Sequence, residues 1–240
     1  MIGAVTAAAA AGLAGGVAQA ATGFGFALVA VPLLALAATP HDAVVAVTAA
    51  SAAMSSWAAW RERREVDRVL TTRICLAAIV GMPAGLAALI LAPQRVLAYG
   101  VAGVALAFLA WTLAGRTVRP GRATVLGAGL IGGAALTSTG MNGPPIVAAL
   151  HALRMPVRRQ RATLQAVFCL QDIVAVAAFA ALGQTSSRVW LYVLCAVPGA
   201  VLGWFAGDVL FRRMDERAAR ALITALLLAS TVALVVTAGG

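Results

Sequence analysis

Two glycine-rich interruptions of apolar sequence carry the residues best suited to chemistry in this chain. They supply Thr22, Gly23, Phe24 and Gly25 in the first, and Ser138, Thr139, Gly140, Asn142, Gly143 and Pro144 in the second. Glycine lets a backbone approach a ligand closely, and hydroxyl and amide groups donate hydrogen bonds. Backbone N–H groups at the start of a helix are unpaired and carry the positive end of its dipole. Both interruptions are therefore predicted to bind a small anion.

A further group of polar residues lies in the middle of an apolar run. Asp172 is flanked by Gln171, and Gln165 lies two helical turns earlier. A carboxyl group at the centre of a membrane helix is costly and commonly functional. Three interpretations stay open. Asp172 takes up a proton and couples its movement to the anion, it orders a donor around an interruption, or it is a structural acid bonded to a neighbouring helix.

The elements that position these residues must be membrane helices. Hydrophobic residues make up 62% of the chain and charged residues only 11%, and apolar runs of spanning length recur from end to end. The formal net charge of +10 comes from arginine alone, and most of the arginines gather in short loops. This is the positive-inside signal of a membrane protein, so we expect no nucleic-acid partner. The chain is predicted to be an all-α polytopic membrane protein.

Six runs are long enough to cross a hydrocarbon core of about 30 Å. They cover residues 43–60, 70–92, 96–115, 162–182, 189–211 and 218–238. The arginine-rich loops at 61–68, 116–122, 154–161 and 212–220 are predicted to be cytoplasmic. The stretch 123–151 lies between two cytoplasmic loops but is too short for two full spans. It is therefore predicted to be a hairpin that turns near the midplane, broken at 140–145.

The first half of the chain repeats this plan. Residues 3–38 form a predicted hairpin broken at 22–26, and three spans follow it, as three spans follow the second hairpin. Each half then has an odd number of net crossings, which turns the second half over. Residues 1–120 and 121–240 are predicted to be inverted repeats with about eight hydrophobic segments and both termini outside the cytoplasm. The two hairpin tips should approach each other near the midplane.

Both interruptions also follow a known pattern. Its residues are Gly23-Phe24-Gly25-Phe26, Pro32, Gly132-Gly133 and Gly140-Met141-Asn142-Gly143-Pro144-Pro145. The pattern resembles the paired glycine-rich signatures of the sulfite exporter TauE/SafE family, also called toluenesulfonate uptake permeases, over nearly the whole chain. The resemblance implies about eight hydrophobic segments in two related halves. It also implies export or uptake of a small anion such as sulfite, sulfoacetate, another sulfonate or a carboxylate.

These observations predict a secondary transporter for a small anion, with the lipid bilayer as its surroundings and protons as a candidate coupling ion. A passive anion channel is an alternative, because it would share the fold. An intramembrane enzyme is a weaker one, because neither HExxH nor GxSxG occurs. We expect no catalytic role, cofactor or metal, since the cysteines lack ligand spacing. Many arginines without lysine indicate a bacterium and hence its inner membrane, whereas the sequence leaves the oligomeric state open.

Overall fold

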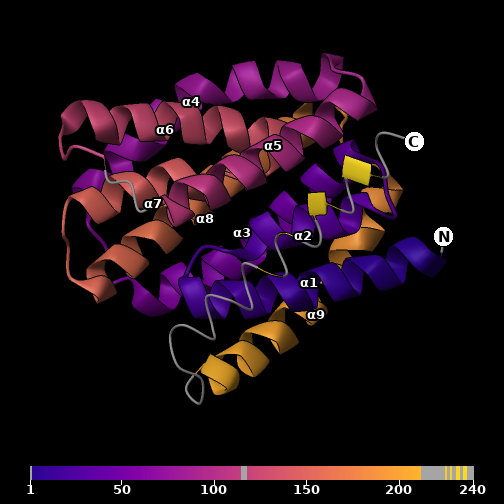
Figure 1. The fold of residues 1–240 in the computed structure, drawn as a ribbon, viewed down its shortest axis with the longest axis horizontal. Helices are drawn as coiled ribbons and strands as arrows, with labels where there is room; N and C mark the ends of the chain where they lie inside the picture. The colour runs from indigo at the N-terminus through magenta and orange to yellow at the C-terminus, as the bar shows by residue number, and fades with distance from the viewer. Residues whose placement is uncertain are drawn as a thin grey trace.

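The computed structural model describes residues 2–114 and 118–211, together with residues 225, 228, 231, 232, 235 and 236. Within these ranges the chain is helical and contains no strand, as the sequence predicted (Figure 1). The helices are α1 (Ile2–Thr22), α2 (Phe26–Ala35), α3 (Pro40–Glu62), α4 (Arg68–Leu91), α5 (Gln94–Leu113), α6 (Arg122–Thr139), α7 (Gly143–Ala152), α8 (Val157–Ala181) and α9 (Ser187–Phe211). The predicted span 218–238 lies outside the described residues, apart from a few isolated positions.

Six of the described helices are long and apolar enough to cross a membrane, namely α1, α3, α4, α5, α8 and α9. Five of these coincide with predicted spans. The sixth, α1, belongs to the first predicted hairpin, yet its 21 residues measure about 31 Å at 1.5 Å per residue. This limb matches the full hydrocarbon thickness, whereas α2, with 10 residues, reaches only about half of it. The first hairpin therefore has one long and one short limb.

The helices break within the two glycine-rich interruptions. Gly23 follows α1 with φ of 80°, and Gly140 follows α6 with φ of 75°. Such left-handed backbone suits glycine, which has no Cβ, and commonly ends a helix. The N–H of Gly140 donates to Leu136 at 2.9 Å, which closes the last turn of α6. Each break is followed by a half-length helix, α2 in the first half and α7 in the second.

Helices from the two halves of the chain are interleaved. α1 packs along α9, and α4 packs along α6, as Figure 1 shows for the α4 and α6 ribbons. Glycines close both contacts. A Cβ at Gly16 would collide with the backbone of Ala200 in α9, and one at Gly133 with the backbone of Ala78 in α4. Small residues let membrane helices approach this closely, which maximises dispersion contacts and backbone proximity.

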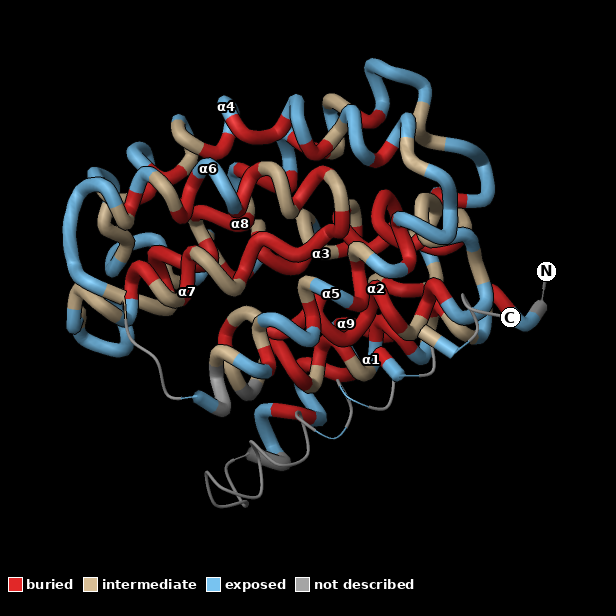
Figure 2. Tube along the Cα trace, turned by 45° about the horizontal axis from the view of Figure 1, so that its top comes forward, coloured by how far each residue is buried: buried red, intermediate tan, exposed pale blue. Residues whose placement is uncertain are grey.

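The core lies around α2 and α3. Most of α2 and one long face of α3 are buried, whereas α4 is exposed along its outer side (Figure 2). α3 contacts α9 of one glycine-packed pair and α6 of the other, and it also contacts α2 and α8. The polar side chains of α3 and α8 face each other within this core.

Candidate functional site

The structure brings the two interruptions into contact. A Cβ at Gly143, the first residue of α7, would lie 3.3 Å from the ring of Phe24 and 3.6 Å from its carbonyl oxygen. A Cβ at Gly140 would lie 3.0 Å from Val31 of α2 and 3.6 Å from the hydroxyl of Thr48 in α3. The first hairpin tip, residues 22–26, therefore packs against the second tip, residues 138–145.

The first tip holds its own backbone donors. The Thr22 hydroxyl donates to a carbonyl one turn earlier at 2.8 Å. It also accepts from the N–H groups of Phe24 at 3.3 Å and Gly25 at 3.0 Å. The Gln19 side-chain oxygen accepts from the N–H of Phe26 at 3.1 Å. In this state the start of α2 offers these N–H groups to the protein and not to a ligand.

Gln165 connects the first tip to α8. Its amide group donates to the Gly23 carbonyl at 2.7 Å and accepts from the Gln19 amide at 3.3 Å. Both glutamines are buried. The sequence pointed to Gln165 but not to Gln19, which is the partner that completes the connection. The sequence could have indicated Gln19, since an isolated amide in an alanine-rich membrane helix needs a polar partner.

The second tip is less completely bonded than the first. The Asn142 amide donates to the Gln171 side-chain oxygen at 2.8 Å, while the Gln171 amide nitrogen is buried without a partner. The hydroxyls of Ser138 and Thr139 donate back to carbonyls of α6 at 2.7 and 2.8 Å.

The backbone donors of the second tip also differ from those of the first. Among the described residues, the backbone N–H groups of Met141 and Asn142 form no hydrogen bond. The nearby Thr48 hydroxyl is fully buried and likewise has no partner. Pro144 and Pro145 need no donor in the first turn of α7, so they cost that turn no hydrogen bond. The second tip therefore has unpaired donors beside the start of a helix, which is the end of a helix that favours anions.

Asp172 bonds to α3 and not to either tip. Its Oδ2 accepts from the Ser51 hydroxyl at 2.7 Å and from the Ser55 hydroxyl at 3.4 Å, and its side chain is 1% exposed. The two serines stand one helical turn apart on one face of α3. Neither serine was predicted from the sequence, although that spacing in an apolar helix indicates a shared polar partner. Gln171, the residue before Asp172, links the same stretch of α8 to the second tip through Asn142.

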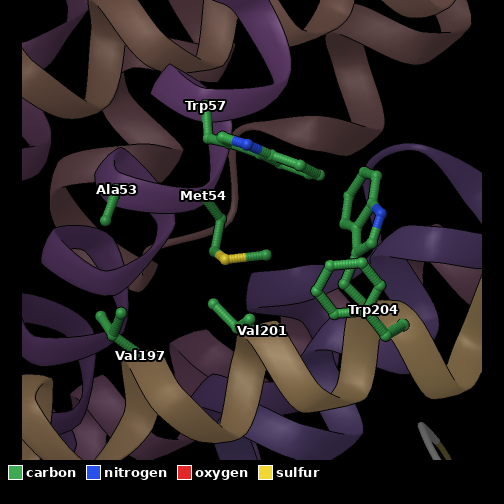
Figure 3. A pocket seen from close by; sticks show the side chains of 7 residues that line it. Ala53, Met54, Trp57, Val197, Val201 and Trp204 are labelled. Atoms are coloured by element: carbon green, nitrogen blue, oxygen red, sulfur yellow. The ribbon is translucent and has the colours of Figure 1, made fainter. Parts of the chain in front are cut away.

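One cavity lies between α3 and α9, and another lies between the end of α3 and the start of α8. The first has a volume of about 290 Å³ and is lined by Ala53, Met54, Trp57, Val197, Val201, Trp204 and Phe205. Figure 3 shows the rings of Trp57 and Trp204 beside Met54; they meet nearly at right angles, with an interplanar angle of 88° and centroids 5.6 Å apart. Its apolar walls do not suit an anion. The other has a volume of about 430 Å³ and charged walls formed by Arg61, Glu62, Arg64, Glu65, Arg158 and Arg161.

The part of the chain that the structure describes contains no cluster of side chains that could hold a metal ion. Three or more His, Cys, Asp or Glu side chains do not gather there. Cys75, Cys169 and Cys195 are free. The buried polar side chains of the described residues are hydroxyls, amides and the carboxyl of Asp172; all of them can form hydrogen bonds, and the carboxyl can also exchange a proton.

The comparison with known protein families gives a match. The sequence model described as "Sulfite exporter TauE/SafE" matches residues 8–234. No curated protein and no solved structure matches the chain. The resemblance carried by the two interruptions is confirmed, because the family match spans almost the whole sequence. The chain therefore belongs to the sulfite exporter TauE/SafE family and is a multi-pass membrane transport protein.

Proposed function

We propose that this member of the TauE/SafE family is a secondary transporter that carries a small anion between its two hairpin tips. Sulfite, a sulfonate or a carboxylic anion is the substrate class. The observation that carries the proposal is the second tip, where open backbone N–H groups lie within two residues of Gly140 and against the first tip. The predicted substrate-binding residues of both tips thus fall in one place.

The donors around the second tip suit an oxyanion. Two backbone N–H groups, the Thr48 hydroxyl and the Gln171 amide nitrogen have no acceptor among the described residues. Leaving a buried donor unpaired costs about 1–3 kcal/mol. An anion with several oxygens would accept from more than one of these donors, and the dipole of α7 would favour its charge. The Phe24 ring would then form the opposite, apolar wall.

The interleaved packing supports two inverted repeats, residues 1–120 and 121–240. α1 and α6 open the two repeats, and each packs through glycines against the fourth helix of the other repeat, α9 or α4. The left-handed glycines Gly23 and Gly140 stand at matching points of the two repeats. Repeats of this kind allow a central site to open alternately to the two sides of a membrane. From the arginine-rich loops we infer that both termini lie outside the cytoplasm, and from the lysine-free composition that the membrane is a bacterial inner membrane.

We assign the coupling role to Asp172. Its carboxyl group joins the two repeats through Ser51 and Ser55, and the adjacent Gln171 reaches the second tip. A proton that enters or leaves this carboxyl would change its bonds to α3 at the contact between the repeats. The anion site at the second tip and the protonation site at Asp172 are therefore linked by adjacent residues of one helix, α8.

Flux of sulfite into proteoliposomes tests the proposal. The wild-type protein should give saturable uptake, and Asn142→Leu should lower the initial rate about tenfold or more, since it removes the amide that holds Gln171, whose unpaired amide nitrogen is one of the proposed donors. Gln184→Leu is the matched control, because it removes an amide that follows α8 and bonds to His41 and the Leu182 carbonyl, away from both tips. An Asn142→Leu protein that transports as well as Gln184→Leu would contradict the tip site. Conductive flux without saturation would instead identify a passive channel.

A further inference from the structure

The first tip lies beside an arginine that the transport site does not explain. Arg161 stands one turn before Gln165 on α8, and its Cγ would lie 3.6 Å from a Cβ built on Gly23. Its guanidinium lies over the Trp204 ring of α9, 5.4 Å from the centroid. Arg161 therefore occupies the junction of the first tip, α8 and α9.

The partner of Arg161 is Glu62, the last residue of α3. The Arg161 Nε and Glu62 Oε1 atoms are 3.2 Å apart, yet neither Arg161 Nε nor Glu62 Oε2 makes a hydrogen bond. The two side chains are only 39% and 27% exposed. This pair gains attraction from its charges but lacks the directed bonds that make an arginine–carboxylate pair strong.

A second ion pair on the same side of the protein shows the contrast. Arg159 Nη2 donates to Asp67 Oδ2 at 2.8 Å. Asp67 also caps α4 by accepting from the N–H of Leu70 at 3.0 Å. That pair holds a loop to a helix start and has a structural role. The pair of Arg161 with Glu62 has no such directed bond.

The loosely bonded pair forms part of the wall of the charged cavity of about 430 Å³. Four arginines and two glutamates line that cavity, so its wall carries a net positive charge. It lies between the loops 61–68 and 154–161, which are predicted to be cytoplasmic. A concave surface with one prevailing charge concentrates ions of the opposite sign. The cavity therefore fits a small anion that arrives from the cytoplasm.

We propose that Arg161 and Glu62 are an exchangeable ion pair that admits the anion from the cytoplasmic cavity to the first tip. The anion displaces Glu62 from Arg161, and the guanidinium then binds it through several N–H groups in a fixed plane. The Trp204 ring keeps the guanidinium in position throughout by a cation–π contact. This inference rests on the proposed anion transport and adds the residues that receive the substrate on one side.

Sided flux measurements test the exchange. In inside-out vesicles, Arg161→Gln should raise the sulfite concentration for half-maximal uptake about tenfold or more, and Arg161→Lys should restore part of the loss. Glu62→Gln should lower that concentration, because the anion no longer competes with a carboxylate. Arg159→Gln is the matched control, since it removes the same charge two residues away. In right-side-out vesicles, Arg161→Gln and Arg159→Gln should have the same half-saturating concentration.

The outcomes separate this inference from the transport proposal. A wild-type protein that moves no anion overturns both. A wild-type protein that transports, with Arg161→Gln indistinguishable from Arg159→Gln in inside-out vesicles, overturns the exchange alone. Glu62→Gln that weakens sulfite uptake as much as Arg161→Gln also overturns it, because the pair would then serve the fold. The melting temperature of each purified variant confirms that the compared proteins are folded.

Discussion

Replacing Gly140 with alanine should destabilise the protein more than the same change at Gly23. Both glycines have left-handed backbone, with φ of 75° and 80°. A side chain there costs about 1–2 kcal/mol. At Gly23 the new methyl group would lie 3.6 Å from the Arg161 side chain, an ordinary contact. At Gly140 it would lie 3.0 Å from the Val31 side chain, and such overpacking costs about 1–3 kcal/mol more.

The expected losses are therefore about 1–2 kcal/mol at Gly23 and about 2–5 kcal/mol at Gly140. Thermal unfolding of the detergent-purified proteins measures them, because 1 kcal/mol shifts the melting temperature of a chain of this size by about 2–4 °C. We expect a drop of about 2–8 °C for Gly23→Ala and about 4–20 °C for Gly140→Ala.

Gly100→Ala is the matched control for this comparison. Gly100 lies inside α5 without a positive φ, and a Cβ there would lie 3.8 Å from the Thr139 methyl group. Alanine favours a helix over glycine, so the melting temperature should hold or rise. Equal losses at Gly23 and Gly140 would refute the argument from the Val31 contact. No loss at either position would refute the left-handed geometry of both tips.

Two further predictions concern the helix contacts and the coupling group. Gly133→Leu should prevent α6 from packing on α4, because a side chain would meet the backbone of Ala78, and size-exclusion chromatography should then show aggregated protein. Gly127→Leu on the same helix faces open space and should elute normally; similar profiles for both would show that the contact is dispensable. Asp172→Asn keeps an acceptor for the Ser51 hydroxyl but cannot exchange a proton, so sulfite uptake should lose its response to an imposed pH gradient. Gradient-driven uptake that persists in Asp172→Asn would leave Asp172 a structural role.

The sequence could predict the elements because hydropathy and glycine act locally. An apolar run beside a charged loop was enough to predict the spans that correspond to α3, α4, α5, α8 and α9. The breaks at Gly23 and Gly140 could be predicted because glycine tolerates left-handed backbone. The full-span length of α1 could not be predicted from its local sequence. Its alanine-rich run has no charged residue to mark the membrane surface, so the expected depth of the turn came from the plan of the second half.

The site itself depends on contacts between residues far apart in the chain. Gln19 reaches Gln165 and Ser51 reaches Asp172 across more than a hundred positions, and no local period reveals such partners. The pairing of Arg161 with Glu62 was hidden for another reason. Arginines in short loops are explained by topology alone, so their positions gave no sign that one of them reaches a hairpin tip.

The contact between α1 and α9 has a consequence for the order in which the protein is made. Its glycines come from opposite ends of the described chain, so α1 enters the bilayer long before the ribosome has produced its partner. During that interval the small-residue face of α1 must be covered by lipid or by another protein, since membrane helices insert first and associate afterwards. The interval between the synthesis of α4 and that of its partner α6 is much shorter, because only α5 lies between them in the chain. A chain halted between its halves would thus present two helices with unmatched glycine faces, α1 and α4.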